Sequence, residues 1–231
     1  MREYFHQQLA EIKSETLRMG SMVEEELKTA LAALESLDTG LARQVYQADK
    51  AVNQLRFALE ERCTVLISTQ QPTAQDLRAI LAVMNMIVDL ERMGDQAKGI
   101  AKVIPGILKY PDDLFVPPLT EMGAMVLEML RQAMTAYAQD NIAVAKAVLP
   151  LDDPVDKRFA RFFSEIMFAM SGADGHEKVE AYYDLLRVAR EIERFGDLAI
   201  NIAERVIYIA TGYVVEGHTD PDEILDYHLD N

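Results

Sequence analysis

Apolar side chains recur every three or four positions along most of the chain, a spacing that predicts amphipathic helices. The first helix is expected over residues 2–36. A polar Asp-Thr-Gly turn at 38–40 ends it and offers an N-cap to a second helix over 41–70. Thr73 then caps a third helix, which Pro105 weakens or ends. No segment alternates apolar and polar residues as a strand does, so the pattern predicts an all-α protein.

Residues 110–118, with the sequence YPDDLFVPP, interrupt the helical pattern and contain three prolines. They are predicted to be a linker between a first unit, 1–109, and a second unit, 119–212. The helices of the second unit and the acidic C-terminal tail behind it are expected at these positions: 118–138, 141–171, 176–211 and 213–231.

The second unit repeats the first. Met122 lies 103 positions after Met19 (122 − 19), and Glu193 lies 102 positions after Glu91 (193 − 91). The difference is one deleted residue in the turn before the final helix. A self-similar period of about 100 residues indicates an internal duplication with three helices in each copy. The periodicity and the duplication together predict a tandem repeat of two antiparallel three-helix bundles built from six long helices.

The third helix of each unit carries two carboxylates four positions apart, Glu91 with Asp95 and Glu193 with Asp197. Residues at this spacing share one face of a helix. A glycine precedes the second acid in both copies, although a glycine inside a helix costs about 1 kcal/mol relative to alanine. Its presence in both copies indicates that another helix approaches closely at this point.

The second helix of each unit carries polar residues that would complete the two groups. Asp49 and Asn53 share a face of this helix in the first unit, and their repeat partners are Asp152 and Asp156. If the second and third helices of each unit face one another here, each unit holds a cluster of acidic oxygens.

Two prolines, Pro150 and Pro154, interrupt the helix that carries the second of these pairs. They predict that the helix is kinked or restarts there, with Asp153 as its N-cap and Pro154 at its first position. Asp152 would then precede the helix, and it would not share a face with Asp156.

Clustered carboxylates repel one another, and partial burial strengthens the repulsion. Bound cations would relieve it, and an all-oxygen ligand set suits hard ions or oxygen-tolerant transition metals. The alternative is a metal-free helical scaffold, in which the acids pair with Arg92, Lys98, Arg194 and other cationic neighbours on solvated faces. The spacing alone leaves both interpretations open.

The composition narrows the function classes. A formal net charge of −15 and a sequence pI near 4.7 disfavour nucleic-acid binding, which needs clustered Lys and Arg. Cys63 is the only cysteine, so no intrachain disulfide or thiolate zinc site is possible, and a buried structural thiol is expected. No apolar run approaches the roughly 18–20 residues of a membrane span, and no signal-peptide pattern is present. We therefore expect a cytoplasmic protein without membrane insertion.

A helical bundle with carboxylate clusters could also be a metalloenzyme of the di-iron type. That class requires a pair of Glu-x-x-His motifs that project into the bundle core from two helices, and the chain lacks such a pair. His176 and Glu177 begin an H-E-x-x-H pattern, but Glu180 stands in place of the second histidine. The enzyme hypothesis is therefore the weaker alternative, and no catalytic residue is assigned.

Several motifs match those of a known family: Asp49-x-x-Val52-Asn53, Gln70-Gln71-Pro72 with Asp76-Leu77-Arg78, Leu90-Glu91-Arg92-Met93-Gly94-Asp95, and Ile192-Glu193-Arg194-Phe195-Gly196-Asp197 with Asn201-Ile202-Ala203-Glu204. On these residues, and over roughly residues 3–215, the chain resembles the PhoU family of regulators associated with bacterial phosphate-specific ABC transporters. Together with the duplication, the motifs are specific.

The resemblance implies two repeated three-helix bundles whose E/D-x-x-x-D motifs bind metal clusters on the surface, with iron or zinc as the expected ions. By position, the expected metal ligands are Asp49, Glu91 and Asp95 in the first unit and Asp152, Asp156, Glu193 and Asp197 in the second. Asn53 stands where a second acid is expected, which makes the first site less charged and weaker.

The resemblance also implies a homodimeric cytoplasmic protein without catalytic activity. Such a protein is expected to restrain phosphate uptake and the phosphate-starvation response. It would act as an adaptor between the ATPase subunit of a phosphate ABC transporter and a phosphate-sensing histidine kinase, and it would lie at the inner membrane only through these partners.

Overall fold

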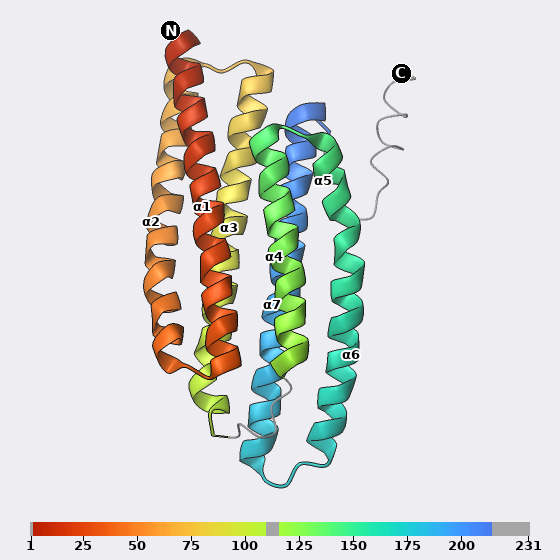
Figure 1. Ribbon diagram of the computed structural model, residues 1–231. Coiled ribbons are helices and arrows are strands. Elements are labelled where there is room, and N and C mark those ends of the chain that lie inside the picture. The colour runs from red at the N-terminus through yellow and green to blue at the C-terminus, as the bar shows by residue number, and fades with distance from the viewer. Residues whose placement is uncertain (1, 110–115, 214–231) are drawn as a thin grey trace.

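The computed structural model describes residues 2–109 and 116–213, and all regular structure within these ranges is helical (Figure 1). The first repeat contains α1 (Arg2–Ser36), α2 (Thr39–Gln70) and α3 (Ala74–Ile107). The second contains α4 (Val116–Gln139), α5 (Ile142–Val148), the 3-10 helix η2 (Leu149–Leu151), α6 (Asp152–Ser171) and α7 (His176–Thr211). Together, α5, η2 and α6 take the place of the one long helix expected over 141–171. The expected all-α fold with six long helices is confirmed. The tail after residue 213 and most of the expected linker lie outside the described residues.

The turn between α1 and α2 contains the N-cap that the sequence predicts. The carboxylate of Asp38 accepts hydrogen bonds from the backbone N–H groups of Gly40 (2.6 Å) and Leu41 (3.2 Å). Thr73 holds the N-cap position of α3, but its hydroxyl donates to the carboxylate of Asp76 (2.8 Å) and accepts nothing from the backbone. The expected helix starts are therefore present, and only the first has a side-chain cap.

Prolines limit the helices less than the sequence suggests. Helix α3 continues through Pro105 to Ile107, and α4 begins at Val116, two residues before its expected start. The first turn of α4 contains Pro117 and Pro118, where a proline has no intrahelical hydrogen bond to lose.

The regular α-helix is interrupted by η2 between α5 and α6, as predicted, but the predicted start of α6 is wrong. Leu151 has dihedral angles of −75° and −9°, so the backbone passes from η2 into α6 without leaving the helical region, and Asp153 caps nothing. Helix α6 begins at Asp152 itself, with Pro154 in its first turn. Asp152 and Asp156 therefore share a helix face, contrary to the expectation from the prolines.

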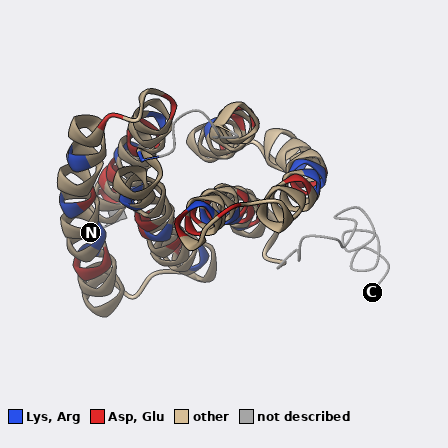
Figure 2. Cartoon of the chain, turned by 90° about the horizontal axis from the view of Figure 1, so that it is seen from below, with Lys and Arg blue, Asp and Glu red and all other residues tan. Residues whose placement is uncertain are grey.

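Helix α7 carries an apolar stripe that is buried in the core, at 0–3% exposure: Val188, Ile192, Phe195, Ala199, Ile202 and Val206. Both repeats contribute to one continuous apolar core. The two groups of helices lie side by side when viewed along their axes (Figure 2). Helix α3 packs against α7, and α1 packs against α4, so that the third helices of the two repeats meet at the centre. None of the described helices is long and apolar enough to cross a membrane.

Gly94 on α3 and Gly196 on α7 lie where another helix comes close. A Cβ on Gly196 would be 3.2 Å from Cγ1 of Val126 in α4, and a Cβ on Gly94 would be 3.0 Å from Oε2 of Glu26 in α1. Both distances are shorter than ordinary van der Waals contacts. The close approach that the repeated glycine predicts is confirmed.

Candidate functional site

Four carboxylates of the second repeat lie on two helices that pack together, and we call them the second cluster: Asp152 and Asp156 from α6, and Glu193 and Asp197 from α7. Burial raises the pKa of Glu193, the charges of the other three raise it further, and only Arg190 opposes the rise. Burial, followed by the charge of Asp156, likewise raises the pKa of Asp197. The charges of the other acids of the second cluster therefore act on Glu193 and Asp197.

Glu193 has a buried oxygen within the second cluster that accepts no hydrogen bond. Its side chain is 15% exposed, and its Oε2 has no hydrogen-bond partner. Its ion-pair contact is Nε of Arg190, at 3.6 Å from Oε2, which is too long for a hydrogen bond. A buried carboxylate oxygen without a donor is unfavourable, so this position suits a bound cation.

The first repeat brings together Asp49 on α2 with Glu91 and Asp95 on α3, which we call the first cluster. Lys98 lies among them and donates from Nζ to Oδ2 of Asp49 (2.8 Å) and to Oδ1 of Asp95 (2.5 Å). Asn53 donates from Nδ2 to the same oxygen of Asp49 (3.2 Å), so it is a hydrogen-bond donor within the cluster. Burial raises the pKa of Glu91, with the charge of Asp95 adding to the rise.

Glu26 on α1 is a fourth acid beside the first cluster, and it was not predicted from the sequence. It is 2% exposed, and neither of its carboxyl oxygens has a hydrogen-bond partner. Burial raises its pKa to about 8, and the negative charge of Asp49 adds to the rise. The sequence contains a signal for this residue, because Glu26 falls on the apolar stripe of its helix between Val23 and Ala30. Its repeat partner, 103 positions later, is the apolar Met129.

The donor sets of the two clusters differ in their suitability for a metal ion. Among residues 2–109 and 116–213, no three His, Cys, Asp or Glu side chains form a group that could hold a metal ion as they are arranged. The second cluster nevertheless consists of oxygen donors with an unsatisfied buried oxygen at Glu193, which suits a hard or oxygen-tolerant cation. The first cluster already contains the ammonium group of Lys98.

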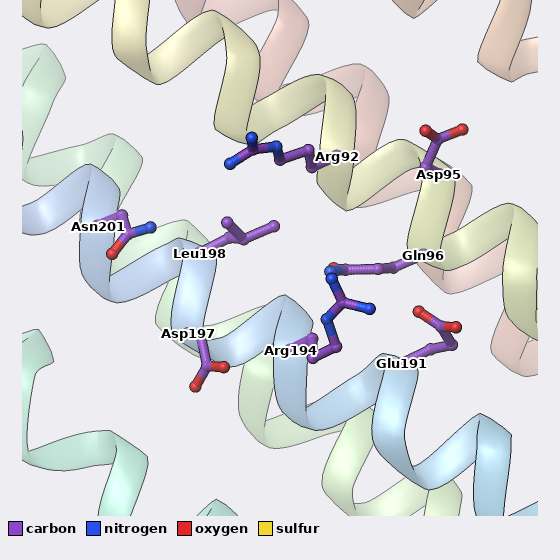
Figure 3. A pocket seen from close by; sticks show the side chains of 8 residues that line it. All are labelled: Arg92, Asp95, Gln96, Glu191, Arg194, Asp197, Leu198 and Asn201. Carbon is purple, nitrogen blue, oxygen red and sulfur yellow. The ribbon is translucent and has the colours of Figure 1, made fainter.

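An open cavity of about 690 Å³ lies between α3 and α7 (Figure 3). Arg92 and Arg194, which are repeat partners, extend from the two helices toward this space, whereas Asp95 and Asp197 point away from each other on its outer sides. Gln96 also lines the cavity, and its Oε1 has no hydrogen-bond partner. The cavity therefore separates the third-helix acids of the two clusters, and it does not join them into a single site.

Comparison with known proteins also identifies a duplicated unit. A model of the PhoU domain matches the chain twice, at residues 16–104 and 119–206. A phosphate-specific transport system accessory protein PhoU homolog from Clostridium acetobutylicum is 35% identical over 216 residues, which cover 93% of this chain and 98% of that protein. The accessory protein PhoU of Escherichia coli is 30% identical over 220 residues, or 95% of this chain and 90% of that protein.

Two solved structures share the fold. The crystal structure of PhoU from Pseudomonas aeruginosa has a TM-score of 0.86 at 30% identity and covers 90% of this chain and 100% of its own. The crystal structure of the phosphate transport system regulatory protein PhoU from Streptococcus pneumoniae has a TM-score of 0.85 at 31% identity. The match covers 92% of this chain and 99% of that chain.

The fold and the two clusters define a class of duplicated all-helical proteins with carboxylate groups between the second and third helices of each repeat. The chain belongs to the PhoU family.

Proposed function

We propose that the protein is an accessory regulator of a phosphate-specific transport system. The observation that carries this proposal is the family match across both repeats, together with relatives of this name that align over more than nine-tenths of the chain. Both halves of the duplication match, so the proposal concerns the protein as a whole. It acts in the cytoplasm as a homodimer, and its role is regulatory and not enzymatic.

The regulator works as an adaptor between two proteins, the ATPase subunit of a phosphate ABC transporter and a phosphate-sensing histidine kinase. It restrains phosphate uptake and the phosphate-starvation response. The helix surfaces support binding to proteins, because three large apolar side chains of α6 are exposed: Phe163 (44%), Met167 (47%) and Phe168 (82%). Exposed apolar groups that share a helix face, as Phe163 and Met167 do on α6, mark interaction surfaces.

Metal ions are part of the proposal, with iron or zinc as the candidates. The second cluster would hold the metal through Asp152, Asp156, Glu193 and Asp197, and the unsatisfied Oε2 of Glu193 supports this assignment. A bound cation would neutralise carboxylates whose pKa values are raised by one another's charge. It would thereby tie α6 to α7 and keep the surface of the second repeat in one arrangement.

The adaptor role is tested by affinity capture with the purified protein as bait. The ATPase subunit and the sensor kinase are offered separately, each at low and at high phosphate. A matched bait with Phe168→Ser and Met167→Ser examines the exposed face of α6. Specific capture of the ATPase subunit or the kinase is the expected result, and capture of neither partner at any phosphate concentration contradicts the adaptor role.

A further inference from the structure

The two repeats neutralise their carboxylates differently, and Lys98 is the residue that differs most. Its ammonium group donates to Asp49 from one helix and to Asp95 from the next, at 2.8 Å and 2.5 Å. Its repeat partner, 102 positions later, is Ile200, an apolar residue with 8% exposure. The second repeat therefore lacks an ammonium group at the position where the first repeat has one.

Two further differences between the clusters lie on the second helix of each repeat. Asn53 donates a hydrogen bond within the first cluster, whereas its repeat partner in the second cluster is the acid Asp156. Arg56 on α2 also acts on the first cluster, since its charge lowers the pKa of Glu91. Its repeat partner is Phe159. The second cluster thus has an acid in place of Asn53 and no lysine in place of Lys98, and the opposing charges on Glu193 and Asp197 come from Arg190 and Arg194.

The ammonium group of Lys98 is bound firmly. Two carboxylates from different helices hold it, Asp49 from α2 at 2.8 Å and Asp95 from α3 at 2.5 Å. Charge-assisted hydrogen bonds are roughly twice as strong as neutral ones, so an incoming metal ion would have to replace two strong interactions.

We propose that the ammonium group of Lys98 takes the place of a metal ion in the first cluster, so that this cluster binds no metal while Lys98 is present. The proposal deepens the proposed metal binding, on which it rests for the nature of the second cluster. It also accounts for the lysine that bridges two helices in the first repeat and for the apolar Ile200 that stands at the same position in the second.

Glu26 adds a further buried carboxyl group beside the first cluster. Its carboxyl group is 98% buried (2% exposed), has no hydrogen-bond partner, and lies toward Asp49 across Gly94. Oε2 of Glu26 and Oδ1 of Asp49 are 3.0 Å and 3.8 Å from the position that a Cβ on Gly94 would take. Without the lysine, the like charges of Asp49 and Asp95 would still act on Glu26.

The experiment uses a chain whose second cluster is disabled by Glu193→Ala and Asp197→Ala. This background is compared with the same background carrying Lys98→Ile, which installs the residue of the second repeat. Zn²⁺ binding is measured by equilibrium dialysis and elemental analysis, and circular dichroism with urea unfolding verifies folding. Should Lys98→Ile prevent folding, Lys98→Met replaces it, because methionine retains most of the length of the side chain.

We expect the background to leave the first cluster empty. Lys98→Ile should add a site there, so that the Kd for Zn²⁺ at this cluster is at least about tenfold lower than in the background. Glu91→Ala in addition to Lys98→Ile should abolish the new site. The proposal is overturned if the background binds Zn²⁺ through Glu91, or if removal of the lysine adds no binding. Equal metal content in the wild-type chain and the background would instead refute metal binding at the second cluster. The comparison at Lys98 would still decide the present proposal.

Discussion

The clearest physical consequence of the structure concerns Glu26, a buried acid without a hydrogen-bond partner. Its pKa is raised from 4.5 to about 8 by burial and by the charge of Asp49. A folded-state pKa above the unfolded value means that the stability linked to this group is complete below about pH 4.5 and is lost as the pH rises through about 8. Within this window the loss is about 1.4 kcal/mol per pH unit, or about 3 kcal/mol between pH 5.5 and 7.5.

The Glu26→Gln variant removes the ionisation and nearly keeps the shape of the side chain. Its free energy of unfolding, measured by urea titration with chelator present, should fall less steeply with pH than that of the wild type. The difference between the two proteins should grow by about 1.4 kcal/mol per pH unit over pH 5–8. Glu25→Gln is the matched control, because the side chain of Glu25 is 73% exposed, and its difference from the wild type should stay constant.

Parallel pH dependences for the wild type and Glu26→Gln would refute the reasoning. They would mean that Glu26 ionises in the folded protein near its ordinary pKa, and therefore that water or a cation reaches the carboxyl group. The constant offset between the two curves is not diagnostic, because a buried glutamine also lacks a partner at this position.

Three further predictions concern the framework. Burial raises the pKa of the Cys63 thiol to about 11, so the folded protein should react with Ellman's reagent at pH 8 far more slowly than the urea-unfolded chain; equal rates would contradict the burial. Gly123→Ala should destabilise the protein by about 1–3 kcal/mol in calorimetry, since its Cβ would meet Leu31, whereas Gly172→Ala, with nothing within 4 Å, should change little; equal effects would contradict the close approach. Asp38→Ala should cost about 1 kcal/mol in urea unfolding and Asp38→Asn much less, because asparagine can still cap α2; equal losses would contradict the cap.

Much of the fold could be predicted from the sequence because helix periodicity is a local signal. The buried stripe of α7, the cap at Asp38 and the close approach at Gly196 all follow from residue spacing on a single helix. The prediction that Asp153 caps α6 failed for a local reason as well. Two prolines suggest a break, but η2 carries the helical backbone through to Asp152.

The composition of the first cluster could be predicted only in part. The spacing of Glu91 and Asp95 places both on one face, but it does not tell which cation they meet. Lys98 donates to Asp95 on its own helix and to Asp49 on α2, and the second contact depends on how α2 and α3 pack. Glu26 comes from α1, a third helix, and its position beside the cluster depends on the glycine that lets α1 approach α3.

The central claim is that the two clusters treat cations differently, and anomalous diffraction tests it most directly. Crystals of the wild-type protein grown with Zn²⁺ would be measured above and below the zinc absorption edge. The account predicts an anomalous peak beside Glu193 and Asp197 and none between Asp49 and Asp95, where Lys98 should remain. Peaks of similar height at both clusters, or no peak at the second cluster, would contradict it.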